Sequence, residues 1–196
     1  MPTTTFHNVS LLLAPGRVMS PRRSSERLVD RALELVGRDG VRVADVGTGS
    51  GAIAVTLALL APHAEVWATD ISASAVSLAR ANAARQGVGE RVHVLPGDLL
   101  EPIPGELDLV LANLPYLPAT LSSDERYADL AGEPAFAVFA TGDGLDLCRA
   151  LIDSAATRLS PGGKVLLQYR AEVYEAGLAE LDALRTRLET ALALAA

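Results

Sequence analysis

The feature that most constrains the fold is a regular alternation of short β-branched runs with longer Ala- and Leu-rich segments. The β-branched runs favour strands, and the longer segments show helical apolar spacing or strong helix formers. The predicted strands cover residues 41–46, 65–69, 91–95, 107–112 and 164–168. The predicted helices cover residues 25–36, 50–61, 72–86, 144–159 and 171–194. This alternation predicts an α/β fold with a mostly parallel sheet and helices on both faces.

A chain of 196 residues is long enough for one domain with its own hydrophobic core. We expect a single domain with an N-terminal segment at 1–23, a ligand-binding core at 24–170 and a C-terminal helix at 171–196. Residues 117–140 break the pattern of short connections, and four of the eight aromatic residues fall between 116 and 139. A short irregular helix on the surface and a lid or substrate-binding loop are both open interpretations.

Composition narrows the classes of partner. The net charge of −7 makes nonspecific nucleic-acid binding less favourable, because such binding needs a basic face. The single cysteine, Cys148, excludes an internal disulfide and a thiolate zinc cluster, and three scattered histidines do not predict a metal site. The longest apolar stretch, 52–61, is too short to cross a bilayer, and no targeting signal stands out. We expect a cytoplasmic protein without a membrane partner.

The strongest local signal is a glycine-rich turn that follows a predicted strand and opens a helix. Its glycines let the backbone turn tightly and approach a ligand closely, whereas the alternative is a tight turn without a ligand. The expected binding residues here are Asp45, Gly47, Thr48, Gly49, Ser50 and Gly51. Residues 49–54 also satisfy G-x-G-x-x-A, so a dinucleotide such as NAD has to be considered.

Two carboxylates indicate which cofactor the turn favours. Asp70, at the end of the second strand, suits the two hydroxyls of a ribose in any adenosine-bearing cofactor. Asp45 lies just ahead of the glycines, where a carboxylate is poorly placed for a pyrophosphate but suits an ammonium and a sulfonium charge. The pattern therefore favours S-adenosylmethionine over NAD. Asp98 is then expected to bind the exocyclic amine of adenine, with Leu99 and Ile71 on the two faces of the ring, although Asp98 alone is typical of a turn cap.

The stretch Asn113-Leu-Pro-Tyr116 follows the fourth strand. An amide nitrogen is a weak nucleophile, and a site can help it by accepting hydrogen bonds from its N–H groups. The Asn113 side-chain oxygen and a carbonyl of the turn at Pro115 are expected to orient such a nitrogen, with Tyr116 packed on the planar group. The alternative is an ordinary Asn/Pro turn that ends a strand.

These residues share one predicted location in the fold. In a Rossmann-like, doubly wound sheet of order 3-2-1-4-5, ligands bind at the carboxyl ends of the strands where the strand order reverses. The glycine turn, Asp70, Asp98 and Asn113 each follow a different strand at that edge. We therefore expect four separate turns to converge on one crevice.

With these residues assembled, the chain resembles class I S-adenosylmethionine-dependent methyltransferases. More narrowly, it is similar to the HemK-type protein-glutamine N5-methyltransferases, which modify the glutamine of the Gly-Gly-Gln loop in peptide-chain release factors. The resemblance runs from about residue 18 to 168. The matching segments are 19–26, with Ser25 at a threonine position, the turn 45–51, Asp70, the Asn-Pro-Pro-Tyr-like stretch 113–116, Glu133-Pro134, 142–145 and 159–163.

Several positions depart from that family pattern. Leu114 replaces the first proline of the motif, and 168–170 stand where the family tends to have a glutamate and a glycine-containing turn. We do not expect the family's helical N-terminal domain in the roughly 20 residues ahead of the resemblance. The fifth strand is expected at a sheet edge that the C-terminal segment, a small partner subunit or a second copy of the chain would cover.

The sequence thus predicts an S-adenosylmethionine-dependent N-methyltransferase acting on a planar amide or amine nitrogen. The resemblance implies a glutamine side chain of a protein substrate, a release factor. The alternatives are an exocyclic amine of a nucleobase, a small molecule, an NAD-binding oxidoreductase and an inactive cofactor-binding module.

Overall fold

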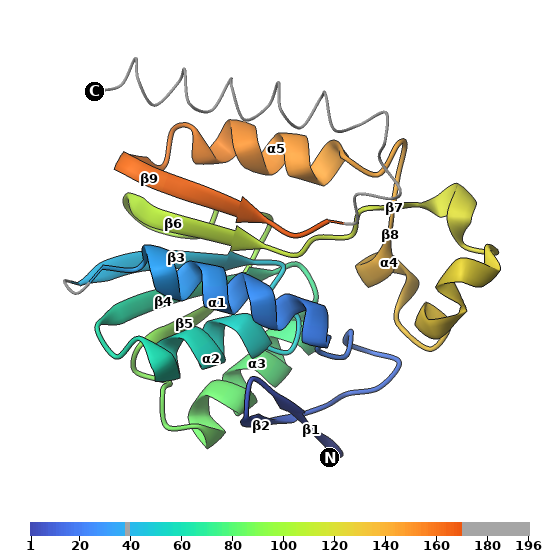
Figure 1. Ribbon diagram of the computed structural model, residues 1–196, viewed down its shortest axis with the longest axis horizontal. Helices are drawn as coiled ribbons and strands as arrows, with labels where there is room; N and C mark the ends of the chain where they lie inside the picture. The colour runs from blue at the N-terminus through green and yellow to red at the C-terminus, as the bar shows by residue number, and fades with distance from the viewer. Residues whose placement is uncertain (38–39, 170–196) are drawn as a thin grey trace.

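The structure is a computed structural model that describes residues 1–37 and 40–169. Its centre is a five-stranded parallel sheet of order β5-β4-β3-β6-β9 (Figure 1). The strands are β3 (Val41–Val46), β4 (Ala64–Asp70), β5 (Val92–Pro96), β6 (Leu107–Ala112) and β9 (Leu159–Leu167). The predicted order 3-2-1-4-5 is confirmed, with β3 and β6 side by side at the reversal.

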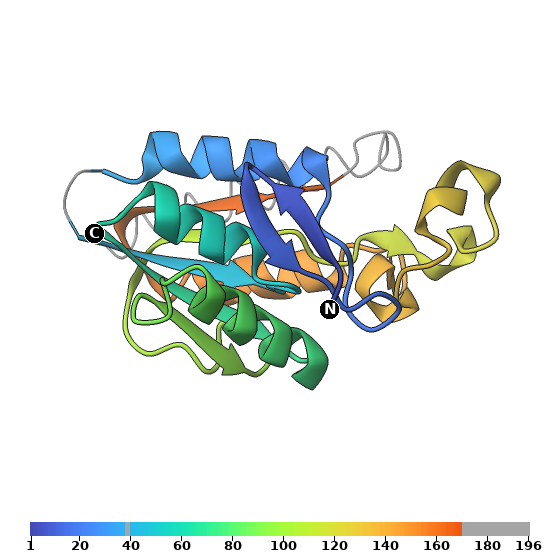
Figure 2. The same ribbon diagram turned by 90° about the horizontal axis from the view of Figure 1, so that it is seen from below.

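Helices cover both faces of this sheet, as predicted. The helices α1 (Glu26–Leu35), α2 (Ala52–Leu60) and α3 (Ala73–Arg85) pack on one face, and α5 (Asp146–Ala155) packs on the other. Figure 2 shows β9 between α1 and α5. Each of these helices starts and ends within a few residues of its predicted bounds, whereas the predicted helix 171–194 lies outside the described residues.

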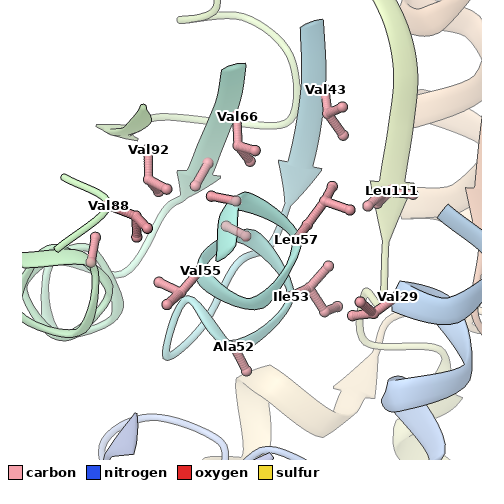
Figure 3. Close-up of a cluster of buried hydrophobic side chains, with 14 of the residues drawn as sticks. Val29, Val43, Ala52, Ile53, Val55, Leu57, Val66, Val88, Val92 and Leu111 are labelled. Atoms are coloured by element: carbon pink, nitrogen blue, oxygen red, sulfur yellow. The ribbon is translucent and has the colours of Figure 1, made fainter. Parts of the chain in front are cut away.

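Side chains of the strands alternate between two hydrophobic clusters. Val43 of β3 and Leu111 of β6 join α1, α2 and α3 in the larger cluster, which Figure 3 shows around α2. Ala44 and Val110, one position along each strand, join α5 in the second cluster. Because the strands are buried on both faces, their sequences are almost continuously apolar. Cys148 of α5 is buried.

The N-terminal segment forms a β-hairpin that the sequence pattern did not predict. Its strands are β1 (Thr3–Phe6) and β2 (Val9–Leu12), and His7 and Asn8 between them have φ angles of 47° and 65°. Two positive φ angles characterise the hairpin turn, but His-Asn lacks the glycine that usually signals it. The hairpin is held by the fully buried Asn82 of α3, whose Nδ2 donates to the Leu12 carbonyl at 3.2 Å.

Residues 117–140 form irregular structure beyond the carboxyl ends of β6 and β9, drawn in yellow in Figure 1. The segment contains the elements β7 (Leu117–Pro118), η2 (Ala119–Leu121), η3 (Glu125–Leu130), α4 (Ala135–Val138) and β8 (Phe139–Ala140). Its own small cluster buries Leu117, Tyr127, Leu130 and Val138. The segment is therefore packed around side chains of its own. Its short helical turns match one of the two open interpretations, the irregular helix on the surface.

The fifth strand starts earlier than predicted, because Leu159 already pairs with Leu107 before a register shift leads to the Leu109–Lys164 pair. Within the described residues, β9 pairs only with β6 and forms the edge of the sheet. None of the helices in residues 1–37 and 40–169 has the length and apolar character needed to cross a membrane.

Candidate functional site

Two adjoining pockets lie at the carboxyl edge of the sheet. The first, here called the strand-end pocket, has an empty volume of about 770 Å³ including its open mouth. It is lined by residues that follow four strands, among them Gly47, Gly49, Asp70, Asp98, Leu99 and Asn113. The expected convergence of four separate turns is present in the structure. The second, the side pocket, is lined by Tyr116, Gln168 and neighbouring residues. Both pockets share the stretch 113–115 as a wall.

The glycine turn is anchored on the end of the neighbouring strand. The backbone N–H groups of Gly47 and Thr48 both donate to the Thr69 carbonyl at 2.9 Å. Gly47 and Gly49, with φ angles of 70° and 56°, line the strand-end pocket, where the absence of a Cβ leaves room for a ligand. Gly51 has a different role, because a Cβ there would lie 3.0 Å from the Ala79 Cβ of α3. It allows helix packing rather than ligand approach.

Asp45 lies beneath the glycine turn and is almost fully buried. Its Oδ2 accepts from Thr48 Oγ1 at 2.7 Å and from the Ala54 N–H at 3.1 Å, which ties β3 to the start of α2. Burial raises the pKa of this carboxyl to about 6, against the hydrogen bonds that lower it. Within the described part of the chain Oδ1 has no hydrogen-bond partner. Asp45 does not line the strand-end pocket; it supports the turn that does.

Asp70 ends β4 and lines the strand-end pocket. Its Oδ2 accepts from the Gly49 N–H at 2.9 Å, and its Oδ1 accepts from the Ser72 N–H at 2.8 Å. Each carboxylate oxygen can accept more than one hydrogen bond, so the group can bind two hydroxyls while it keeps these contacts. The glycine turn and the start of α3 thus hold this carboxylate at the pocket.

The apolar part of the pocket is formed by side chains after β4 and β5. Ile71 is 73% exposed although it is a large hydrophobic residue. Leu99 has a φ angle of 43°, a conformation that non-glycine residues rarely adopt, and Thr69 Oγ1 donates to its carbonyl at 2.8 Å. Asp98 beside it is exposed. These side chains suit a planar ring that carries an amine. The strained leucine and the exposed isoleucine offer apolar surfaces to the ring, and the carboxylate can accept a hydrogen bond from the amine.

Asn113 comes directly after β6 and takes part in both pockets. Its Nδ2 donates to the buried Ser25 Oγ at 3.1 Å. Pro115 also lines both pockets, whereas Tyr116 lines only the side pocket. Leu114 is buried, and its Cδ2 is the atom that a Cβ on Gly47 would meet at 2.9 Å. The leucine therefore packs between the glycine turn and the Asn113 turn.

The predicted site residues thus separate into two groups. The first group lines the strand-end pocket and consists of Gly47, Gly49, Asp70, Ile71, Asp98, Leu99, Asn113 and Pro115. The second group lies outside its lining and consists of Asp45, Thr48, Ser50, Gly51 and Tyr116. Met19 and Phe136, which come from distant segments and were not predicted, line the pocket as well. Phe136 is 56% exposed although it is a large aromatic residue, and only the structure reveals this sign of a binding role.

These residues fit S-adenosylmethionine. The carboxylates of Asp70 and Asp98 line the pocket and suit a cofactor that carries ribose hydroxyls, an exocyclic amine and cationic groups, and the two glycines with positive φ leave the backbone open to it. Ile71 and Leu99 offer apolar faces for adenine. The cofactor, when bound, supplies an activated methyl group on sulfur.

Fold and site together define the class of the S-adenosylmethionine-dependent methyltransferases with a Rossmann-like sheet. A family model described as the methyltransferase small domain matches residues 24–142. The chain belongs to this family.

Curated relatives carry a more specific name. The chain is 42% identical over 165 residues to the release factor glutamine methyltransferase of Moorella thermoacetica, covering 83% of this chain and 58% of that protein. It is 43% identical over 160 residues to the one of Deinococcus radiodurans, covering 80% of this chain and 56% of that protein. The chain therefore spans less than two thirds of the length of these relatives.

Solved structures share the fold. TrmN from Thermus thermophilus is 29% identical with a TM-score of 0.53, covering 77% of this chain and 40% of that one. The ribosomal protein L11 methylase from Lactobacillus delbrueckii subsp. bulgaricus is 24% identical with a TM-score of 0.61, covering 90% of this chain and 73% of that one. The latter likeness concerns the fold alone.

Proposed function

We propose that the protein transfers a methyl group from S-adenosylmethionine to the side-chain amide nitrogen of a glutamine in a peptide-chain release factor. The observation that carries this proposal is the wall shared by the two pockets. Asn113 and Pro115 border both the strand-end pocket, which fits the cofactor, and the side pocket. An acceptor in the side pocket therefore meets the methyl donor beside the Asn113 amide.

Asn113 and the turn after it provide what an amide nitrogen needs. Nδ2 of Asn113 is engaged by Ser25, so Oδ1 is the atom available to accept an N–H from the acceptor. A backbone carbonyl of the 113–115 turn accepts the second N–H, and the two contacts orient the nitrogen lone pair toward the methyl carbon. Tyr116 packs against the planar amide.

The reaction is an in-line displacement. A nitrogen–carbon bond forms as the carbon–sulfur bond breaks, sulfur keeps the bonding electron pair, and the nitrogen then loses one proton to solvent. Catalysis by this chain consists of holding the nitrogen in line and excluding water, with Asp70 and the glycine turn keeping the donor in place.

The acceptor is assigned as a protein glutamine on two grounds: the names of relatives with about 40% identity and the acidic balance of the chain. A net charge of −7 opposes a nucleic-acid partner.

The reaction takes place in the cytoplasm, where translation occurs. The outer edge of β9 is covered by a small partner subunit or a second copy of the chain. Sedimentation velocity tests whether this edge is covered. It is measured on the chain purified alone and on the chain purified together with any subunit that accompanies it.

The test is methyl transfer from isotopically labelled S-adenosylmethionine to full-length release factor, followed by mass spectrometry of the glutamine-containing peptide. We expect label on the glutamine and none on a release factor carrying Gln→Ala at that residue. Label on RNA or DNA instead would support the nucleobase alternative. Saturable binding of NAD but not of S-adenosylmethionine would support an oxidoreductase, and cofactor binding without transfer to any acceptor would support an inactive module.

A further inference from the structure

Two adjacent serines contact two side-chain amides at the ends of neighbouring strands. In η1 (Arg23–Ser25), Ser25 Oγ accepts from Asn113 Nδ2 at 3.1 Å, and Ser24 Oγ accepts from Gln168 Nε2 at 3.2 Å. The partners follow β6 and β9, 88 and 144 positions along the chain. Ser25 is 4% exposed and makes no capping hydrogen bond to α1 through its side chain. Its hydroxyl is therefore directed to the Asn113 amide rather than to the helix.

A side-chain amide has a donor end and an acceptor end of nearly the same shape, so its neighbours decide which end faces a ligand. Ser25 holds the nitrogen end of Asn113, and among the described residues none donates to Oδ1. An acceptor that presents two N–H groups needs the oxygen end. The reversed amide would oppose N–H to N–H and would lose the hydrogen bond that orients the nucleophile. A serine hydroxyl can bond either end of an amide, so the two N–H groups of the acceptor select the oxygen end, and Ser25 holds the opposite end in place.

We propose that Ser25 is a positioning residue that holds the Asn113 amide in the plane from which Oδ1 reaches the methyl acceptor. This inference rests on the proposed function only in the choice of a nitrogen acceptor with two N–H groups. Ser25 does not contact the acceptor; it acts through the orientation of Asn113. Without the Ser25 hydroxyl, the amide rotates about its Cβ–Cγ bond and spends only part of its time in the productive orientation.

The test is a double-mutant cycle between Ser25 and Asn113. Ser25→Ala lowers kcat for methyl transfer about tenfold, the equivalent of one lost hydrogen bond, without changing the Kd of S-adenosylmethionine. Ser25→Thr keeps a hydroxyl and restores kcat to within about twofold. Asn113→Ala removes the amide that Ser25 holds, so Ser25→Ala then changes kcat by less than about twofold in the Asn113→Ala background.

Ser24→Ala is the matched control. It removes a hydroxyl from the same turn and loses a contact to Gln168, but it leaves Asn113 held. Its effect on kcat is the same with Asn113 and with Asn113→Ala. Equal effects of Ser25→Ala in both backgrounds would overturn the inference, because a structural role gives additive losses. Ser25→Thr as impaired as Ser25→Ala would overturn it as well.

A readout without turnover separates this inference from the proposed function. In the ¹⁵N spectrum of the protein, we expect the Asn113 side-chain protons to give slowly exchanging signals, and Ser25→Ala to shift them toward solvent-exposed values. Signals unchanged by Ser25→Ala would refute the positioning role whatever the acceptor is. An unmethylated release factor together with the expected spectral change would refute the glutamine assignment and leave the positioning role standing.

Discussion

The cofactor half and the acceptor half of the site are built in different ways. The cofactor half consists of turns that directly follow strands, held by contacts between neighbouring strand ends such as Gly47 N–H to the Thr69 carbonyl. The acceptor half is assembled from three segments that are distant in the chain. Ser20 N–H donates to Glu133 Oε2 at 3.0 Å across 113 positions, and Arg22 pairs with Asp129 at 2.7 Å across 107.

This difference separates what a local pattern encodes from what tertiary contacts encode. Parallel strands bring their carboxyl ends to one edge, so the cofactor half is assembled once the sheet forms. The acceptor half needs η1 and 117–140 to dock on the turn after β6 as well. Changes in the first half are therefore expected to alter cofactor affinity or stability, and changes in the second half to alter the use of the acceptor.

Asn113→Ala gives the largest effect. We expect kcat to fall by about 10²–10³-fold, as for loss of a hydrogen-bonding group that acts on the reacting atoms. The Kd of S-adenosylmethionine, measured by calorimetry, changes less than about threefold, because the glycine turn and Asp70 remain. Parallel losses in kcat and in cofactor affinity would show that the two halves are not separable at this residue.

Asp45→Asn tests the buried carboxylate of the cofactor half through pH. The folded pKa is about 6 against 3.8 for the free group. Between these values the folded protein binds more protons than the unfolded chain, so this group's contribution to stability falls as the pH rises from about 4 to about 6. The loss amounts to about 3 kcal/mol, at about 1.4 kcal/mol per unit of pKa difference.

Denaturant unfolding at pH 4.5, 5.5 and 7 measures this effect as the difference between the wild-type chain and Asp45→Asn. The carboxamide keeps an oxygen for Thr48 Oγ1 and the Ala54 N–H but does not ionise. The difference in unfolding free energy moves in favour of Asp45→Asn as the pH rises. A difference that is constant over this range would contradict the raised pKa.

The same division explains how much the sequence predicts. The strand order and the four convergent turns follow from local patterns. The hairpin was missed because its turn is His7-Asn8, without glycine. Ser25 and Phe136 were missed as site residues because nothing near them in the chain indicates which strand end they meet.

Two glycine substitutions separate packing from binding within the cofactor half. Gly51→Ala places a Cβ 3.1 Å from the Ala79 Cα at a φ of 78°, so we expect a loss of about 2 kcal/mol in unfolding free energy. Gly49→Ala meets nothing closer than Val18 Cγ1 at 3.9 Å, and its φ of 56° costs about 1 kcal/mol. Because Gly49 lines the strand-end pocket, its substitution weakens cofactor binding more than stability. The reverse ranking in thermal unfolding would contradict these roles.

Arg22→Ala gives the smallest effect and tests the boundary between the halves. Its ion pair with Asp129 is partly exposed, so its loss costs less than about 1 kcal/mol. Arg22 lines the side pocket, and we expect a two- to threefold higher KM for the release factor at about constant cofactor Kd. The matched control is Arg126→Ala, which breaks an exposed pair with Asp124 inside the 117–140 segment and leaves that KM unchanged. If Arg22→Ala weakened cofactor binding more than acceptor use, the docking of the N-terminal segment on Asp129 would belong to the cofactor half, and the division by chain distance would fail.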